Sequence, residues 1–559
     1  MKYRPGVTSL LLLSLAQNGL TADEAVIRVI VKYKQTPTRS SLKKQLTQTV
    51  NFPLKMIEPM AAGAYVLGFD SKAVQSKAAK DVEIRTQEVL KLMRKDPNVI
   101  YALKDRVGYF KPVPKPQADE IAALLSHDAQ WDEFSPPGGL MLESAAGRRD
   151  GAWAYTTGKA VNPIIVAVLD TGIALNSSLV NNLVKDEQGK IWGWNFSANN
   201  NDILDETGSY HGTHVAGTIA GYGDVMLGVG EHLKVLPIKI PDSTGMFYES
   251  QVINAIYWSV GGNVPGVPMN PYPAKVLNMS FGVDERRGKE MVHCDEAMQD
   301  ALFFARSKGA VITVAAGNEN RWEYYNAPGI CNGTIKIAAT GPDGLRAYYS
   351  NYGPSVSFAA PGGDLHYGLQ GGILSTVNPG GGLQGSGFDF YQGTSMASPH
   401  AAGVAGLIFA IRQGQITPEK VEQILYATTH AFGQSEDSNN SCVGMKPCGS
   451  GILDAKNAVK AASADYDLIF TTPKIDSLAL KTCAKNAYQP QPSSLKSGRV
   501  EWLQVKTVCQ AKLNFRTSQL KQTQDGKIIL SYGGVSYRLN DSNFKHCELI
   551  GVQGIGCYL

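Results

Sequence analysis

The sequence predicts an α/β protein in which a parallel sheet carries helices on both faces. A small α+β domain precedes it, and a small β-rich domain with cysteines follows it. Continuous apolar runs at 164–173 and 311–316 end in a polar residue or a glycine turn, as buried parallel strands do. Small-residue apolar segments at 210–221 and 396–411 read as helices, so strands and helices alternate along the chain.

The segment Gly-Thr-Ser-Met-Ala-Ser-Pro-His, residues 393–400, places Ser395 at the start of the second helix. A serine hydroxyl becomes a nucleophile when a base removes its proton, and a helix N-terminus offers N–H groups where negative charge develops. The alternative is an ordinary Gly-Thr-Ser helix cap, with proline in the first turn. Taken alone, the segment favours the cap.

Two upstream residues change that balance. Asp170 ends the first apolar run, at the sheet edge where open α/β sheets keep their sites, and His211 starts the first helix. Separately, they read as a turn residue and as a histidine of the core or surface. Asp170, His211 and Ser395 each lie at the end of an element, and this conjunction favours a catalytic site.

With these motifs, the chain resembles the subtilisin-like serine proteases, or subtilases, over roughly residues 125–460. Segments 261–268, 273–282 and 349–353 resemble the secreted bacterial members in particular. The resemblance implies a subtilisin-like parallel sheet and hydrolysis of peptide bonds. By resemblance, Asp170 orients the imidazole, His211 acts as general base and then general acid, and Ser395 attacks the scissile carbonyl.

The resemblance also assigns a donor for the tetrahedral oxyanion. Asn318 follows the strand at 311–316 and matches the family's oxyanion asparagine, which donates beside the backbone N–H of Ser395. Thr394 is expected to assist. An asparagine next to glycine is otherwise a common turn residue.

A peptide substrate is expected to bind as an extended strand. By resemblance, Ser280, Phe281 and Gly282 form one edge of the cleft and residues 245–248 the other. The residues matching the S1 pocket are Ala315, Ala316 and Gly317, with Glu319 at its rim. Glu319 could favour a basic P1 residue, but a solvated turn charge is an equally good interpretation, so the P1 preference stays open.

The N-terminus has the organisation of a signal peptide, predicted for residues 1–22. Lys2 and Arg4 precede an apolar run at 7–16, and Ala22 marks the cleavage region. The run is too short to anchor the chain in a membrane, so a secreted protein, extracellular or periplasmic, is expected. A disordered N-terminal tail is the alternative.

Residues 23–116 are expected to form an α+β propeptide. Alternating apolar residues at 26–31 precede a helix-like stretch at 74–93, and a final strand at 97–103 resembles the end of the family's inhibitory propeptide. The proline-rich segment 111–116 reads as a linker. The resemblance implies a precursor whose propeptide inhibits the enzyme, assists its folding and is removed on activation.

The charge distribution fits this division. Residues 31–115 carry a net charge of +10 and residues 116–559 a net charge of −7. The basic residues are scattered without an arginine-aromatic stripe, so complementarity to an acidic domain is favoured and no nucleic-acid partner is expected.

Eight cysteines in an exported chain indicate disulfides, and no Cys-x-x-Cys spacing supports a metal site. The layout favours Cys294 with Cys331 and Cys442 with Cys448 inside a peptidase domain at 120–463. The tail, residues 464–559, reads as a β-rich domain of unknown role, with strands at 500–508, 527–532 and 535–539. Its four cysteines allow three connectivities, of which Cys483 with Cys509 and Cys547 with Cys557 is weakly favoured.

No cofactor is expected for the chemistry, whereas structural calcium is common among subtilases. The aspartate usually found after the catalytic strand is replaced by Ser178, and the loop at 221–230 is short. Both changes remove oxygen ligands, so the usual calcium site is in doubt. An oxygen-rich loop containing Asp202 and Asp205 is a weak alternative metal site, and a solvated acidic loop is the simpler interpretation.

Two rival functions remain open to the sequence. A silent binding protein on the same fold would need a broken triad or oxyanion donor, and none is broken. A processing protease for specific precursors would keep the chemistry. The absence of an obvious acidic S1 cluster favours a degradative enzyme instead.

Overall fold

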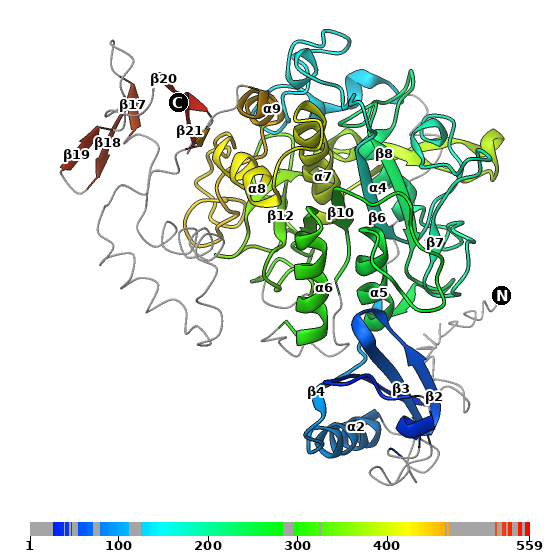
Figure 1. Cartoon of the computed structure of the whole chain (residues 1–559). Helices are drawn as coiled ribbons and strands as arrows, with labels where there is room; N and C mark the ends of the chain where they lie inside the picture. Colours follow the sequence, from blue (N-terminus) through cyan, green and yellow to red (C-terminus); the bar gives the residue numbers. More distant parts are fainter. Residues whose placement is uncertain are drawn as a thin grey trace, which may run out of the picture. The chain divides into compact units, whose positions relative to one another are not determined.

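The computed structural model describes residues 26–38, 40–43, 46, 54–70, 79–110, 124–282, 294–322, 327–463, 467–468, 520–522, 528–532, 535–538, 546–550 and 554–558. The chain divides into two compact units, residues 1–105 and 106–559 (Figure 1). The predicted signal peptide and the linker at 111–116 lie outside the described residues.

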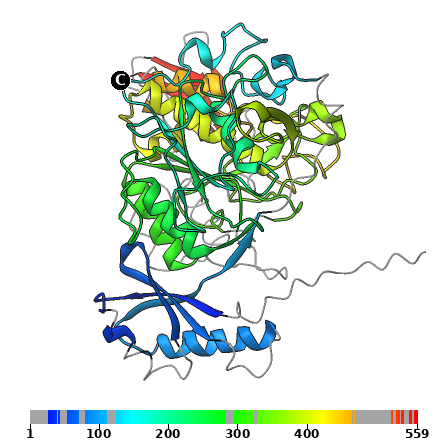
Figure 2. The same ribbon diagram turned by 90° about the vertical axis from the view of Figure 1, so that its right-hand side faces the viewer.

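The first unit is an antiparallel sheet with strand order β2-β3-β1-β4. Its elements are β1 (Val26–Tyr33), β2 (Leu54–Pro59), β3 (Ala64–Asp70), α2 (Ala79–Met93) and β4 (Val99–Lys104). Every second residue of β1, namely Ile27, Val29 and Val31, is buried in a core shared with Val89 and Leu90 of α2. Helix α2 covers one face of the sheet (Figure 2), as expected for an α+β domain.

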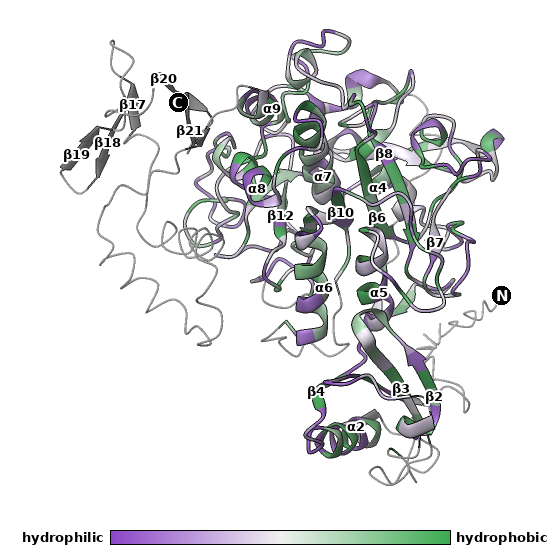
Figure 3. Ribbon diagram, in the orientation of Figure 1, coloured by the Kyte–Doolittle hydropathy of each residue, from purple (hydrophilic) through white to green (hydrophobic). Residues whose placement is uncertain are grey.

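The second unit is built on a seven-stranded parallel sheet. In spatial order its strands are β13 (Phe358–Pro361), β12 (Ile335–Thr340), β11 (Val311–Ala315), β10 (Val276–Met279), β6 (Ile165–Asp170), β8 (Lys234–Lys239) and β7 (Trp194–Asn195). Its central strands are almost wholly apolar and buried, and they are green in the hydropathy colouring of Figure 3. The continuous apolar runs therefore correctly predicted parallel strands.

Helices cover both faces of this sheet, which confirms the α/β fold class. Helices α4 (His211–Ala220) and α7 (Thr394–Ile411) pack together on one face, and α5 (Glu249–Ser259) and α6 (Glu296–Ser307) pack together on the other. Two further helices, α8 (Pro418–Ala427) and α9 (Ala455–Ser463), pack against α7. The side chains of Asp295 and Thr417 cap α6 and α8 by accepting backbone N–H groups of their first turns.

Helix α7 is the central helix of the core. Among the described residues it is the one helix long and apolar enough to cross a membrane, and nearly all of it is buried inside this unit. Its glycines permit close packing, because a Cβ atom at Gly403 would lie 2.5 Å from Val229 Cβ and one at Gly406 would lie 2.7 Å from Leu233 Cδ1. Length and hydropathy here reflect a buried core helix.

Two predicted disulfides are present, Cys294–Cys331 and Cys442–Cys448. The tail contains β16 (Asp467–Leu468), β17 (Leu520–Gln522), β18 (Ile528–Tyr532), β19 (Val535–Arg538), β20 (His546–Ile550) and β21 (Gly554–Tyr558). They form two antiparallel sheets, ordered β16-β21-β20 and β17-β18-β19, in which Cys547 and Cys557 are register partners. The predicted strand at 500–508 and the pairing of Cys483 with Cys509 lie outside the described residues.

Candidate active site

The carboxyl ends of three neighbouring strands supply one side of the site. Asp170 ends β6, Ser280 follows β10, and Asn318 lies three residues beyond β11. Helices α4 and α7 begin at this sheet edge with His211 and with Thr394-Ser395. The fold therefore gathers residues that are up to 225 positions apart in the sequence around one edge, as expected for an open parallel sheet.

The Asp170–His211 pair is buried and well oriented. The Nδ1 of His211 donates to Asp170 Oδ1 at 2.7 Å, and the backbone N–H of Thr171 donates to the same oxygen at 2.8 Å. Thr171 Oγ1 accepts the backbone N–H of Gly212, which ties the start of α4 to the end of β6. Gly212 is required at this contact, because a Cβ atom there would lie 2.3 Å from the carbonyl oxygen of Gly172.

Electrostatics favour a proton on this imidazole. Burial by itself would lower the pKa of His211, but attraction to Asp170, the hydrogen bond to Asp170 and attraction to Asp205 raise the pKa above its ordinary value. Asp205 is buried, and its carboxyl group accepts hydrogen bonds from the hydroxyls of Thr171 and Thr207. Asp205 thus bonds to the residue that follows Asp170, whereas the other weak metal candidate, Asp202, is exposed.

Ser395 lies in the first turn of α7. Its hydroxyl donates to the Ser280 carbonyl at 2.9 Å, and the Ser280 hydroxyl donates back to the Ser395 carbonyl at 2.9 Å. In this rotamer the serine proton points to the segment after β10 and not to His211. The reciprocal pair of bonds fixes the start of α7 against the end of β10.

The side-chain amide of Asn318 is held in one orientation by Thr394. The backbone N–H and the hydroxyl of Thr394 both donate to Asn318 Oδ1 at 2.8 Å, and Thr394 Oγ1 accepts the backbone N–H of Gly317 at 3.0 Å. Because Oδ1 receives two donors, the NH₂ end of the amide must point away from Thr394. A Cβ atom at Gly393 would lie 3.4 Å from that nitrogen and 3.6 Å from the backbone nitrogen of Ser395. Glycine at 393 thus leaves open the space between two N–H donors.

An extended segment of the chain pairs with one expected edge of the cleft. Strand β5 (Val107–Tyr109) is antiparallel to β9 (Met246–Tyr248), and the N–H of Phe110 continues the ladder to the carbonyl of Gly245 at 2.9 Å. The Phe110 ring lies 5.8 Å from the His211 ring and 5.1 Å from that of Phe281, between centroids. Residues 245–248 therefore accept an extended strand that leads to the imidazole.

The remaining predicted substrate residues come from the segments that follow β10 and β11. Ser280, Phe281, Ala315 and Ala316 are buried, and Gly282 and Gly317 are partly exposed. Glu319 Oε2 accepts the backbone N–H of Asn318 at 3.0 Å and the side-chain amide of Asn351 at 2.8 Å. This carboxylate is tied to the loop and is more than a freely solvated turn charge.

The sequence interpretation did not single out His214, one turn after His211 on α4. Its ring stacks on Tyr391 at 4.3 Å, and its Nε2 donates to the carbonyls of Ile373 and Asp389. Complete burial lowers the pKa of His214 to about 3, so the ring is neutral. The i, i+3 spacing from His211 was the available signal, because such residues share a helix face.

A parallel α/β sheet with a buried Asp–His pair and a helix-start serine at one edge is the arrangement expected of the class of serine hydrolases. Residues 162–450 match the sequence model of the Subtilase family, peptidase S8, and the chain belongs to this family of serine endopeptidases.

Curated relatives extend over most of the chain. It is 30% identical over 497 residues to an "Extracellular basic protease" of Dichelobacter nodosus, covering 81% of this chain and 73% of the relative. It is 31% identical over 476 residues to an "Extracellular protease" of Xanthomonas campestris pv. campestris, covering 80% and 74% of the two chains.

Solved structures agree with this assignment. A protease from Pseudoalteromonas arctica is 35% identical, with a TM-score of 0.52, and the match covers 60% of this chain and 98% of that one. Fervidolysin from Fervidobacterium pennivorans, described as a keratinolytic enzyme related to subtilisin, has a TM-score of 0.54 at 23% identity, covering 78% and 61%. The second likeness concerns the fold alone.

Proposed function

We propose that the protein is a secreted endopeptidase whose catalytic residues are Asp170, His211, Ser395 and Asn318. The observation that carries this assignment is the buried hydrogen bond between Asp170 and His211 at the sheet edge where Ser395 and the oriented Asn318 amide also lie. Secretion is supported by the names of the two bacterial relatives, both described as extracellular.

In the proposed reaction, Ser395 turns about χ1 and gives its proton to His211 Nε2 as Oγ attacks the scissile carbonyl. The resulting imidazolium is stabilised by Asp170, and the oxyanion accepts hydrogen bonds from Asn318 Nδ2 and the backbone N–H of Ser395. His211 then protonates the leaving amine, and the C–N bond breaks to give an acyl-enzyme. Water, deprotonated by His211, releases the acid and restores the serine hydroxyl.

The substrate side chains are assigned to pockets in the same framework. An extended peptide would lie between residues 245–248 and the segment of Ser280, Phe281 and Gly282, with its P1 side chain beside Ala315, Ala316 and Gly317. The pairing of β5 with β9 supports this binding mode. Glu319 stays a candidate for attracting a basic P1 residue, because its carboxylate lies next to Asn318.

Precursor processing is proposed with the boundaries expected from the sequence. These are a signal peptide at 1–22, a propeptide at 23–116, a peptidase domain at 120–463 and a C-terminal β-rich domain at 464–559. The position of Phe110 beside His211 supports inhibition by the propeptide end, because a substrate could not pair with β9 while β5 is there. The propeptide would also act as a folding aid.

The proposed chemistry uses side chains and water, and needs no cofactor. Structural calcium stays possible. Two residues before Ser178, which replaces the usual calcium ligand, the Asn176 amide donates to the carbonyls of Val377 and Gly387, and Asn176 Oδ1 accepts the N–H of Ser178. These hydrogen bonds use polar groups of the loop that an ion would otherwise bind. They support the expectation that the usual calcium site is altered in this chain.

The test is cleavage of denatured protein together with labelling by a fluorophosphonate, which reacts with an activated serine. The processed chain should be labelled and should cleave, and Ser395→Ala and His211→Ala should lose both activities. Ser398→Ala, which removes another buried hydroxyl of α7, is the matched control and should retain them. Cleavage that persists in Ser395→Ala would overturn the assignment.

A further inference from the structure

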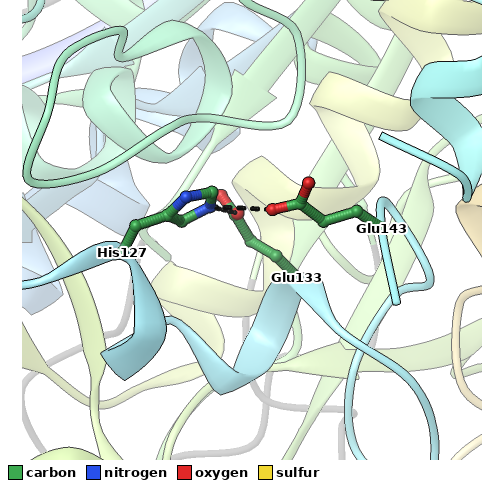
Figure 4. A group of neighbouring side chains, drawn as sticks. All are labelled: His127, Glu133 and Glu143. Carbon is green, nitrogen blue, oxygen red and sulfur yellow. Dashed lines mark hydrogen bonds and ion pairs between the residues drawn. The ribbon is translucent and has the colours of Figure 1, made fainter. Parts of the chain in front are cut away.

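Three side chains outside the proposed catalytic site converge near the start of the second unit. They are His127 in the turn η3 (His127–Ala129), Glu133 in the turn η4 (Trp131–Glu133) and Glu143 in the loop that follows. Figure 4 shows the imidazole edge directed at both carboxyl groups, and one ligand atom from each residue lies within 4.8 Å of the others. Among the described residues this is the one such group of three or more histidine, cysteine or acidic side chains.

The carboxyl groups are unusually deep for a pair of acids. Glu133 is 2% exposed and Glu143 is 0% exposed, whereas the side chain of His127 is 16% exposed. The trio sets two buried carboxyl groups against one imidazole, so the acidic groups outnumber the basic one. The guanidinium of Arg149 attracts Glu133 electrostatically, but its ion pair is with Glu231 at 2.9 Å. Burying a carboxylate is costly unless its charge is compensated, and a divalent cation is one group that compensates it.

Groups outside the trio fix both carboxylates. Glu143 accepts the backbone N–H groups of Gly147 and Arg149, one on each oxygen. Glu133 Oε1 accepts the side-chain amide of Gln130, which leaves Oε2 to face His127. Such outer contacts are what orients carboxylate ligands in protein metal sites. Each carboxylate therefore presents one oxygen toward the same imidazole nitrogen.

We propose that His127, Glu133 and Glu143 bind a zinc ion. One imidazole nitrogen and two carboxylate oxygens form a ligand set that zinc accepts, whereas calcium and magnesium prefer oxygen alone. At zinc bond lengths of about 2.1 Å, ligand atoms of a tetrahedron lie about 3.4 Å apart. The Nε2 of His127 is 3.2 Å from Glu143 Oε1 and 2.7 Å from Glu133 Oε2, so a small outward shift of the partly exposed imidazole opens the site.

The ion would have a structural role in the second unit. Gln130, which orients Glu133, also bonds to the N–H and the carbonyl of Leu227 in the loop after α4. Asp132, next to Glu133, accepts from His400 on α7 at 3.0 Å. A metal bridging η3, η4 and the Glu143 loop would therefore brace the segment that contacts α7 and the loop after α4.

The test uses the full chain carrying Ser395→Ala, which prevents self-cleavage, with zinc and cobalt(II) as probes. We expect one equivalent of zinc to remain after dialysis, measured by plasma mass spectrometry, and cobalt(II) to give the visible absorption of a four-coordinate site. His127→Gln, Glu133→Gln and Glu143→Gln should each weaken binding at least tenfold and abolish the zinc-dependent rise in melting temperature. His366→Gln removes an exposed imidazole 3.4 Å from Asp364 and should change neither.

Two results would overturn the proposal. One is zinc at well below stoichiometry in the chain with Ser395→Ala. The other is zinc that the three variants retain but His211→Ala loses, which would move the metal to the proposed catalytic imidazole. If the glutamine variants do not fold, X-ray absorption at the zinc edge of a chain carrying both Ser395→Ala and His211→Ala decides the matter. One imidazole with oxygen ligands supports the site, and a shell without imidazole refutes it.

Discussion

Replacing Thr394 by valine tests how the Asn318 amide is held. The change keeps the side-chain shape and removes the hydroxyl, which donates to Asn318 Oδ1 at 2.8 Å and accepts from Gly317 N–H at 3.0 Å. The backbone N–H of Thr394 still donates to the same Oδ1. Thr394→Val therefore removes one of two bonds that orient the amide, and it does not remove the amide itself.

The expected magnitude follows from that difference. One hydrogen bond contributes about 0.5–1.5 kcal/mol net, so kcat should fall by about 2- to 13-fold with KM little changed. Asn318→Ala removes a whole oxyanion donor, which costs about 2.7–4 kcal/mol, or about 10²- to 10³-fold in kcat. KM should stay nearly unchanged in Thr394→Val and in Asn318→Ala, because the oxyanion forms only after the carbonyl has been attacked.

The assay is steady-state cleavage of a chromogenic peptide by the processed enzyme. Thr394→Ser keeps the hydroxyl and should restore most of kcat. Thr428→Val, which removes a buried hydroxyl that donates to the Ile424 carbonyl, should leave kcat unchanged. If Thr394 acts through Asn318, Thr394→Val should have no further effect on kcat in an Asn318→Ala background. An equal loss in both backgrounds would refute the reasoning.

Three further predictions concern the same site. Asp205 helps raise the pKa of His211, so Asp205→Asn should lower that pKa. Because the imidazole must be neutral to act as a base, the acid limb of the kcat/KM profile should move to lower pH. An acid limb that does not move would contradict this prediction. The pKa of His214 is about 3 when folded, against about 6.5 when unfolded, so the unfolded chain binds the extra proton as pH falls. Because of this residue, the free energy of unfolding should fall by about 2 kcal/mol as the pH drops from 7 to 5. In urea titrations, His214→Gln should lose less free energy of unfolding over the same pH range. Gly393→Ala should lower kcat by about tenfold or more, because the added Cβ would enter the space beside Asn318 Nδ2. The circular dichroism spectrum should stay unchanged. Full activity of this variant would show that the oxyanion does not occupy this space.

Local sequence patterns predicted much of the second unit. The apolar run that ends at Asp170 is compatible only with a buried strand. The small-residue segments that start at His211 and Ser395 are compatible only with core helices. Their positions at element ends were enough to identify the candidate site, because parallel strands share one carboxyl edge. The S1 edge and the oxyanion asparagine came from family resemblance.

Features that depend on long-range pairing were not predictable in the same way. Strand β5 pairs with residues about 140 positions later, and nothing in Val107–Tyr109 specifies that partner. His211 and His214 look alike in sequence and both are buried. The Asp170 carboxylate raises the pKa of His211, whereas His214 bonds to backbone carbonyls and burial lowers its pKa. The convergence of His127, Glu133 and Glu143 depends on two irregular turns and a loop, which carry no periodic signal.

The β5–β9 pairing has a kinetic consequence. Residues 107–110 belong to the same polypeptide as the cleft, so their local concentration there is on the order of millimolar. A peptide supplied at micromolar concentration competes poorly with such a tethered strand. Freshly folded enzyme should therefore show a lag before turnover begins. If residues 107–110 are first released from the cleft by an intramolecular step, the length of that lag will not depend on enzyme concentration.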